Sequence, residues 1–331
     1  MAGRIAFLGD TLLGADAQPV LDREGYDYAL AEIAPLVADA DLVVANLEGV
    51  VSDRPLAPVP HRRWAYRARE ASLDALLAIG VRLVSLGNNH VLDFGQEGFT
   101  DTLAALDAAG ISHCGAGPDD HAARRPAIVE VAGHRIAFVS AMASYKLHLE
   151  NDGYARCGHG GPARLRKATI KGDLAALEDV DLRVALLHWG RNFHPITHRQ
   201  RRMADALRRS SADLIVGHHP HIAQDVDCSG RIPVLFSIGN AAFGSIGRFA
   251  KFGVPPYGLL ATVELDDSGG LSAVEVRLLL VDNRIVNYRT RAVDGEEASR
   301  ALGTLLEPRG EWNATERGMR WERDRSLAEA R

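Results

Sequence analysis

Hydrophobic positions along the chain follow two patterns, short continuous runs and longer segments with a helical period. The short runs are rich in Val, Ile and Leu and end at glycine or polar residues, which is typical of buried strands. The longer segments place apolar residues three or four positions apart, as at Phe99, Leu103 and Leu106, which predicts amphipathic helices. Because the predicted strands alternate with helices, the pattern indicates an α/β fold.

These runs define the predicted elements of secondary structure. The predicted strands are Arg4–Leu8, Leu42–Ala45, Leu83–Leu86, Ile128–Val131, Ile136–Ser140, Val184–Leu187, Leu214–Val216, Val234–Ile238, Leu259–Leu265 and Leu271–Val281. The predicted helices are Tyr28–Ala38, Ala71–Ile79, Gln96–Ala109 and Arg199–Arg209. The turn residues Ala132-Gly133-His134 between two of the strands predict a hairpin.

The length of the chain favours one large domain with a small addition. The protein has 331 residues, and α/β folds of about 250 residues or more often form a single unit. We expect a domain over residues 1–290 and a charge-rich, helical appendage over residues 291–331. The net charge of −5 does not suggest a nucleic-acid partner, since such proteins usually carry a basic surface.

The sequence carries no segment that indicates export or a membrane anchor. Its beginning, MAGRIAFLGD, lacks the apolar core of a signal peptide. No apolar run approaches the roughly 18 residues that span a bilayer. The three cysteines, Cys114, Cys157 and Cys228, are too few and too scattered for a disulfide framework. These features together predict a cytoplasmic protein; they do not predict its oligomeric state.

Polar residues follow five of the predicted strands directly. In open α/β sheets, sites form beyond the carboxyl ends of strands, so we expect these residues to converge. Carboxylate, amide and imidazole groups together suit a divalent metal such as Ca, Mn, Mg, Fe or Zn. The absence of cysteine from these segments argues against a structural zinc site. The residues are Asp10; Asn46 and Glu48; Asn88, Asn89 and His90; His188; and His218, His219 and His221.

Each of these residues also has a simpler explanation when it is taken alone. Asp10 after Gly9 is compatible with an ordinary turn, Glu48 with a cap, and His188 with a buried, hydrogen-bonded histidine. The sequence His219-Pro220-His221 is more specific. Alternate side chains of an extended segment point to the same side, so both rings are expected to face one site.

The order of the motifs resembles that of a known family. Gly-Asp, Asn-Leu-Glu, Asn-Asn-His-x-x-Asp-x-Gly, His-Trp-Gly, Gly-x-His-Pro-His and Ser-x-Gly-Asn follow one another between Gly9 and Phe243. This order is similar to that of the CapA/PgsA family, which comprises poly-γ-glutamate biosynthesis proteins related to the calcineurin-like metallophosphoesterases. The resemblance implies a metallophosphatase-type fold, a two-sheet β-sandwich flanked by helices.

The resemblance also implies roles for individual residues. His90 corresponds to an acid/base histidine, Asp93 is placed to orient its ring, and Asp10 is a candidate for proton transfer beside the metal. Glu48 stands where the phosphoesterases have a bridging aspartate. The implied metal ligands are Asp10, Glu48, Asn89, His188, His219 and His221.

Two departures from the family pattern bear on the reaction. Leu12 occupies the position of a histidine ligand in the phosphoesterases, which removes one ligand and disfavours a full two-metal mechanism. The capsule proteins are typically anchored in a membrane, and no anchor is recognisable here. Soluble relatives of this kind resemble epimerases of lasso-peptide pathways.

We expect a peptide or poly-glutamate-like substrate, and three functions remain open. The first is Cα epimerisation of a residue in a precursor peptide, with a metal stabilising the intermediate and His90, Asp93 and Asp10 moving protons. The second is phosphoester or other metal-assisted hydrolysis, and the third is an accessory role in poly-γ-glutamate synthesis. The aperiodic segment Ser144–Arg166 is expected to cover the site. Candidate anion-binding residues, with a solvated surface as the alternative, are Arg62, Arg63 and Arg191.

Overall fold

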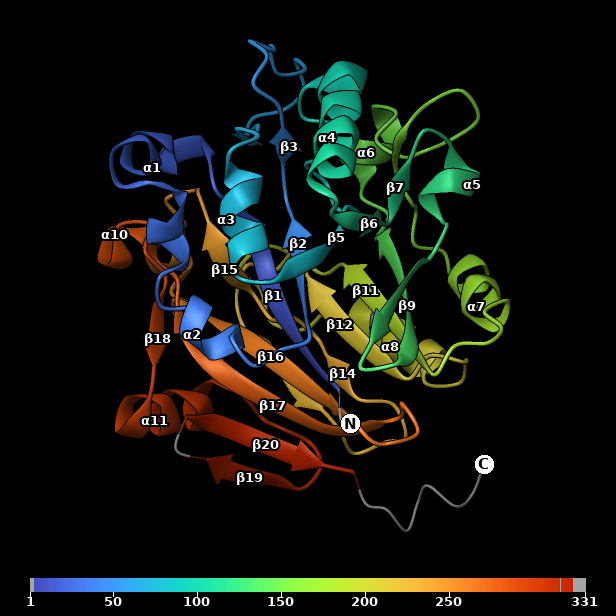
Figure 1. Ribbon diagram of the computed structural model, residues 1–331, viewed down its shortest axis with the longest axis vertical. Helices are drawn as coiled ribbons and strands as arrows, with labels where there is room; N and C mark the ends of the chain where they lie inside the picture. Colours follow the sequence, from blue (N-terminus) through green and yellow to red (C-terminus); the bar gives the residue numbers. More distant parts are fainter. Residues whose placement is uncertain (1–2, 316, 324–331) are drawn as a thin grey trace.

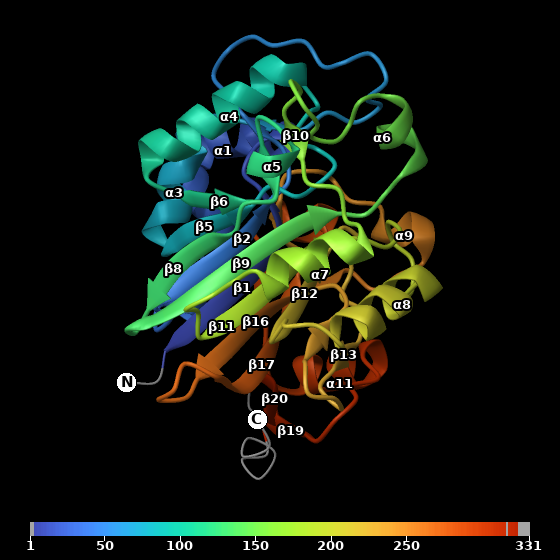
Figure 2. The same cartoon turned by 90° about the vertical axis from the view of Figure 1, so that its right-hand side faces the viewer.

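Two β-sheets pack face to face, and helices cover their outer faces (Figures 1 and 2). The computed structural model describes residues 3–315 and 317–323. Both sheets contain parallel and antiparallel neighbours. The architecture confirms the fold class predicted from the sequence, an α/β sandwich of two sheets flanked by helices.

The first sheet has β1 near its centre. Parallel pairing joins β1, β2, β5 and β6, whereas β16 and β17 continue the sheet in antiparallel pairing. In spatial order its strands are β19 (Trp312–Thr315), β20 (Gly318–Glu322), β17 (Leu271–Leu280), β16 (Tyr257–Leu265), β1 (Arg4–Leu12), β2 (Leu42–Leu47), β5 (Val81–Ser85) and β6 (Ser112–Cys114). Two further strands, β15 (Asn240–Phe243) and β18 (Arg291–Val293), pair with β1 and β17.

The second sheet is built around the parallel strands β9, β11, β12 and β14. Its spatial order is β13 (Val226–Asp227), β14 (Val234–Leu235), β12 (Leu214–His218), β11 (Leu182–His188), β9 (His134–Met142) and β8 (Ala127–Val131). The predicted hairpin is the antiparallel pair of β8 and β9. Two small two-stranded sheets lie outside the sandwich sheets. One pairs β3 (Val50–Val51) with β4 (Arg67–Ala68), and the other pairs β7 (Ala116–Gly117) with β10 (Gly161–Pro162).

Helices pack on both outer faces of the sandwich (Figure 2). The first sheet is covered by η1 (Ala15–Ala17), α1 (Gln18–Glu24), η2 (Tyr26–Leu30), α2 (Ala34–Val37), α3 (Ser72–Ala78) and α4 (Gly95–Ala109). The second sheet is covered by α7 (Lys167–Ala175) and α8 (His198–Leu207). The remaining helices are α5 (Asp120–Ala123), α6 (Lys146–Glu150), α9 (Phe249–Phe252), α10 (Asn283–Val286) and α11 (Gly295–Leu305).

The alternation of side chains along β1 explains why both faces of this strand are apolar. Ile5 and Phe7 point into the core between the sheets, where the rings of Phe7 and Phe138 lie 6.5 Å apart. Ala6 and Leu8 point the other way, into the core beneath the helices. Because successive side chains of a strand face opposite sides, a strand covered on both faces must be apolar throughout.

The predicted helix Tyr28–Ala38 is wrong. The structure has a 3₁₀ turn at Tyr26–Leu30 and a separate short helix, α2. Pro35 lies in the first turn of α2. A proline ring clashes with the preceding turn inside a helix but fits a first turn, so a new helix begins there.

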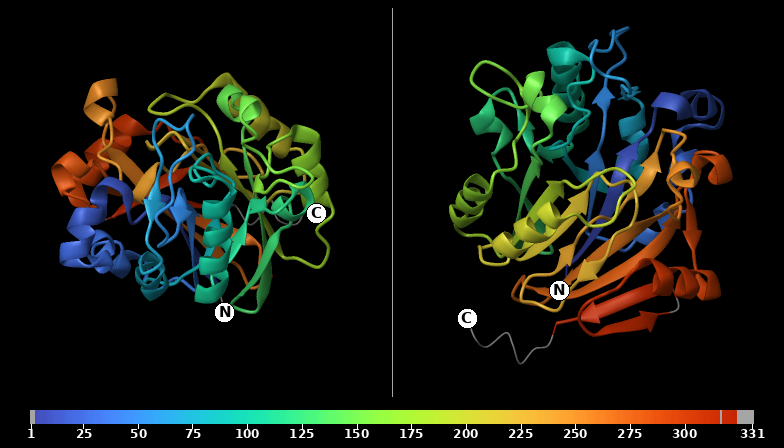
Figure 3. Two further views of the ribbon diagram at one scale, coloured as in Figure 1. Left: turned by 90° about the horizontal axis from the view of Figure 1, so that it is seen from above. Right: turned by 180° about the vertical axis from the view of Figure 1, so that it is seen from behind.

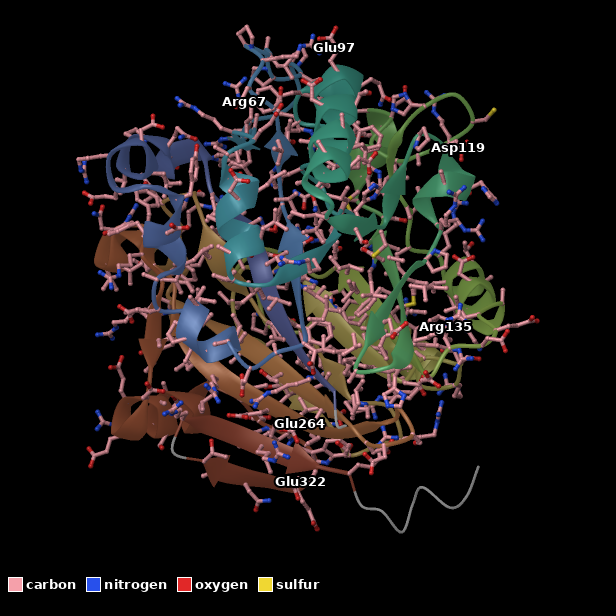
Figure 4. All side chains as sticks on the ribbon, viewed as in Figure 1. Arg67, Glu97, Asp119, Arg135, Glu264 and Glu322 are labelled. Atoms are coloured by element: carbon pink, nitrogen blue, oxygen red, sulfur yellow. The ribbon has the colours of Figure 1, made fainter. Side chains whose placement is uncertain are left out.

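The C-terminal segment differs from the expected helical appendage. It contains α11, but β18 and β20 pair with β17 and thereby extend the first sheet (Figure 3). On this outer surface Arg320 forms an ion pair with Glu264, a residue labelled in Figure 4. Residues 316 and 324–331 lie outside the described part of the chain, and the domain boundary at residue 290 stays a prediction.

Within residues 3–315 and 317–323, no helix combines the length and the apolar character that crossing a membrane would require.

A first prediction concerns Gly9, where β1 approaches β15. A Cβ atom at this position would lie 1.9 Å from the carbonyl oxygen of Gly239, which accepts the backbone hydrogen bond of Asp10. Replacing Gly9 by alanine is therefore expected to lower the free energy of unfolding by about 1–3 kcal/mol. Urea denaturation measures this change.

The matched control is Gly172→Ala in the exposed part of α7, where an added Cβ meets no atom within 4 Å. This variant is expected to be neutral or more stable by up to about 1 kcal/mol, because alanine favours the helix. Equal stability of the Gly9 variant and the wild type would contradict the prediction, because it would mean that the backbone at Gly239 can move away from Gly9 without a cost in free energy.

Candidate metal centre

The predicted site residues come together where strands of both sheets end. Asp10 lies within β1, and Glu48 directly follows β2. His188 is the last residue of β11, and His219 directly follows β12. The sandwich therefore brings carboxylates from the first sheet against imidazoles from the second.

One group of donor atoms surrounds Glu48 on the side of the second sheet. His188 Nε2 lies 3.0 Å from His219 Nδ1 and 3.7 Å from Glu48 Oε1. Asn89 Oδ1 lies 3.2 Å from His219 Nδ1 and also contacts His188 Nε2. Two imidazoles, one carboxylate and one amide oxygen thus point toward a common position, as the ligands of a divalent ion do.

A second group of donor atoms uses the same Glu48 carboxylate. His221 Nδ1 lies 3.0 Å from Asp10 Oδ2, and His221 Nε2 lies 3.9 Å from Glu48 Oε1. Asn240 Oδ1 lies 3.0 Å from His221 Nδ1. The structure therefore brings all six predicted metal ligands together, although their role as ligands stays a prediction.

The environment of Glu48 fits a bound cation. Its side chain is fully buried, and the described residues offer no hydrogen-bond partner to Oε1. Burial and the nearby charge of Asp10 raise the pKa of Glu48 well above its ordinary value. A buried carboxylate without compensation is costly, and a divalent ion beside Oε1 would remove that cost.

The histidines are held in the form that binds metals. Burial and the charge of His219 lower the pKa of His188 well below its ordinary value, and burial together with His221 does the same for the pKa of His219. Both rings are therefore neutral near pH 7, and neutral imidazole is the ligand form. Burial opposes ionisation of Asp10, yet the hydrogen bond and charge of His221 lower the pKa of Asp10 to about 2.

His90 stands beside this centre in a chain of polar contacts. Its Nε2 lies 3.8 Å from Glu48 Oε1, and its Nδ1 lies 2.6 Å from Asp93 Oδ2. The backbone N–H of Tyr66 also donates to Asp93 Oδ2, at 2.9 Å. This arrangement fixes the orientation of the ring, as expected for Asp93 from the sequence.

Arg62 continues the chain of contacts and is not a surface residue. Its side chain is only 6% exposed, and its Nε lies 3.3 Å from Asp93 Oδ1. Both ring nitrogens of His148 lie 3.3 Å from its guanidinium nitrogens. Burial and the charge of Arg62 lower the pKa of His148 to about 3, so this ring stays neutral. Arg63 and Arg191, by contrast, are exposed.

The segment His219-Pro220-His221 does not have the expected extended backbone. His219 has φ of 97° and His221 has φ of 61°, both in the left-handed region. Such values cost about 1–3 kcal/mol each in residues other than glycine, and they cluster at functional sites. The two rings nevertheless face the same centre, with their centroids 6.0 Å apart.

Leu12, at the position of the missing histidine, supplies no donor atom to the centre. Its side chain packs with Ala68 and Phe243 in a small apolar cluster. The group of Asp10, Glu48 and His221 still supplies donors within 4.8 Å of one another. The departure at Leu12 therefore removes one donor but leaves two groups of donors around Glu48.

A cavity of about 170 Å³ opens over His90 and His221. Leu147 and His148, from the segment Ser144–Arg166, line this cavity. This part of the segment lies at the mouth of the site, as expected from the sequence. Arg248 also lines the cavity, beside Arg63 and Trp64.

Sequence reasoning noted some of the supporting residues without assigning them a role. Asn46 donates to Asp10 Oδ1 at 2.8 Å, and Asn88 donates to Asn46 Oδ1 at 3.2 Å. Both residues belong to the polar strand ends, and this position in the sequence was the signal that placed them near the site. Tyr66, whose ring lies 4.4 Å from that of His90, had no such signal because it follows no predicted strand.

The fold and the grouped donors define an α/β sandwich protein with a candidate metal centre. A family model described as "Bacterial capsule synthesis protein PGA_cap" matches residues 4–245, and the chain belongs to this family. The family resemblance seen in the motifs is thereby confirmed. The comparisons give no support to a link with lasso-peptide epimerases.

Curated relatives carry related descriptions. The chain is 28% identical over 249 residues to the capsule biosynthesis protein CapA of Bacillus anthracis, covering 72% of this chain and 59% of that protein. It is 30% identical over 301 residues to a probable polyglutamine synthesis accessory protein of Mycobacterium tuberculosis, covering 87% and 78%. The chain thus spans about three fifths of the Bacillus anthracis protein.

A solved structure shows the same kind of fold. A hypothetical protein from Thermus thermophilus aligns with 83% of this chain and 98% of its own length. The TM-score is 0.53 and the sequence identity is 19%, so the likeness concerns the fold alone.

A second prediction concerns the central position of Glu48. Because both groups of donors include this carboxylate, Glu48→Gln should remove nearly all bound divalent metal from the purified protein. His219→Ala affects one group and should leave the other. Elemental analysis after reloading with metal measures both, with His113→Ala on β6 as the control. Full metal content in the Glu48 variant would contradict the assignment.

A third prediction concerns pH. A metal must displace the proton that the raised pKa of Glu48 retains, whereas Asp10 is already ionised and His188 already neutral. Metal affinity should therefore rise with pH. Metal at about 100 times its Kd should stabilise the protein by about 2.7 kcal/mol, and the same concentration should stabilise less at about pH 5 than at about pH 8. Thermal unfolding measures this, and equal shifts would contradict it.

Proposed function

We propose that this protein is a metal-dependent enzyme that hydrolyses amide bonds in a glutamate-rich peptide or polymer. The observation that carries the proposal is the Glu48 carboxylate, shared by two groups of metal donors and lying 3.8 Å from His90. The family description and the names of the relatives refer to capsule and polyglutamine synthesis, which supports an amide-linked polymer as the substrate.

The residues around the centre suit the steps of hydrolysis. When bound, divalent metal supplies a Lewis acid and an activated water. The water oxygen bonds to the amide carbon, the carbon–nitrogen bond breaks, and the leaving nitrogen takes up a proton. His90 lines the cavity and is held by Asp93 through Nδ1, so its Nε2 is placed to take a proton from the water and pass it to the leaving nitrogen. Arg62 keeps Asp93 paired and in place.

The mouth of the cavity suits a negatively charged substrate. Arg248 lies over the ring of Trp64 at 4.6 Å and near that of Phe193 at 5.3 Å. Arg63 also lies over the Trp64 ring, likewise at 4.6 Å. Neither arginine has an acidic partner among the described residues, so both guanidinium groups are available to carboxylates of a substrate.

Cα epimerisation, the first hypothesis from the sequence, has no specific support. The described residues place one oriented acid/base pair, His90 with Asp93, against the cavity. Epimerisation needs a proton donor and acceptor on opposite faces of the α-carbon. The histidines across the centre are candidate metal donors, and that role supports hydrolysis rather than a second acid/base pair.

A fourth prediction tests the reaction. The metal-loaded protein should release shorter chains from poly-γ-glutamate, and His90→Ala should slow this release by about 10²–10⁴-fold. Chromatography of the products measures the rate, and His113→Ala on β6 serves as the control. The His90 variant should keep its bound metal.

The same incubation in D₂O separates the alternatives. Hydrolysis introduces no deuterium at the α-carbon, whereas epimerisation through a carbanion must introduce it. Deuterium incorporation with intact chain length would reject the hydrolase in favour of the epimerase. No change in chain length or isotope content with the metal-loaded protein would leave the accessory role as the better explanation.

A further inference from the structure

A large groove lies outside the metal centre, between α7 and α8 on the second sheet. Figure 2 shows the two helices side by side on this face, and residues of the two helices are in contact. The groove has a volume of about 890 Å³. It is large enough for several residues of a peptide chain.

The rim of the groove is strongly basic. Among the described residues that line it, Asp205 on α8 is the one acidic residue. The basic residues are exposed, and none forms a hydrogen bond or ion pair through its side chain with the described residues. They are Lys167, Arg191, Arg199, Arg202 and Arg209.

The floor of the groove is apolar and rigid. Trp189 is buried, and its indole N–H donates to the carbonyl oxygen of Phe236 at 2.7 Å. The other apolar lining residues are Ala143, Leu165, Met203 and Ala206. An apolar floor below a basic rim suits a polypeptide, which offers both carboxylates and hydrocarbon, better than a small inorganic anion.

The groove and the metal centre share a wall. Tyr145 lines the groove, and its ring lies 4.9 Å from that of His219. The Tyr145 hydroxyl donates to the carbonyl oxygen of Gly190 at 3.3 Å, which ties the wall to the end of β11. A chain held in the groove would therefore lie directly beside the metal centre.

We propose that this groove binds an acidic polypeptide segment, with carboxylates on the arginines of α8 and the chain against Met203. Arg199 and Arg202 lie three residues apart, so they project from the same side of the helix. The ten residues of α8 span about 15 Å, the length of roughly five extended residues. The groove thus adds a binding site outside the metal centre, and binding there does not require a metal.

The test measures binding of fluorescein-labelled hexaglutamate to the full chain by fluorescence anisotropy. The double variant Arg199→Glu/Arg202→Glu is expected to bind about tenfold more weakly, the size expected for reversing several exposed charge contacts. The matched control is Arg284→Glu/Arg300→Glu, an equal charge change at exposed arginines on α10 and α11. This control should bind within about twofold of the wild type.

Further binding measurements decide which kind of ligand the groove recognises. Arg199→Gln/Arg202→Gln should weaken binding less than the reversal and in the same direction. Higher salt should weaken wild-type binding, because the Debye length falls from about 10 Å at 0.1 M to about 3 Å at 1 M. Equal or tighter binding of inorganic polyphosphate or of a single-stranded oligonucleotide would overturn the choice of a polypeptide.

The outcome is independent of the proposed reaction. Glu48→Gln should bind hexaglutamate as the wild type does, even when it holds no metal and cleaves nothing. Equal losses in the groove variant and its control, or no binding of hexaglutamate by the wild type, would overturn the groove assignment. Binding of hexaglutamate without its hydrolysis would reject the proposed reaction and would still support the groove as a binding site.

Discussion

The buried carboxylate of Glu48 is the constraint on which the arrangement of the site depends. A charge inside a protein is costly unless other groups compensate it, and the described residues leave Glu48 Oε1 without a hydrogen bond. Ring nitrogens of His90, His188 and His221 surround this oxygen at 3.7–3.9 Å. These separations are too long for hydrogen bonds, yet they are suitable for donors around a shared cation. This arrangement is consistent with a cation bound beside Glu48 Oε1.

The sandwich is what makes this organisation possible. The carboxylates come from β1 and the end of β2, whereas the histidines come from β11 and the segment after β12. The apolar core between the sheets, with contacts such as Phe7 against Phe138, holds the two halves in register. The amide of Asn46 donates to Asp10 and to Glu48, at 2.8 and 3.3 Å, and stops the carboxylates from turning away. Core packing and the polar centre thus depend on each other.

Some features were predictable because local patterns determine them. The strands around the site and the helix α4 follow from hydrophobic period alone, and the polar residues at the strand ends identified the candidate ligands. The prediction of a helix over Tyr28–Ala38 was wrong because a new helix begins with Pro35 in its first turn. The prediction of an extended backbone at His219 was wrong. This residue has a left-handed conformation, which residues other than glycine adopt only where the surrounding structure holds them in it. Arg62 was indistinguishable from its exposed neighbour Arg63, because burial beside Asp93 depends on distant residues.

The sequence by itself determined the α/β class, the family and the residue types available for metal chemistry, because hydrophobic period and motif order are local properties of the chain. Only the tertiary structure decided that Glu48 serves two groups of donors, that Arg62 is paired with Asp93, and that β18 and β20 extend the first sheet. It also decided that a basic groove lies against Tyr145 beside the metal centre. These features join residues far apart in the chain, and such contacts exist only once the two sheets have packed together.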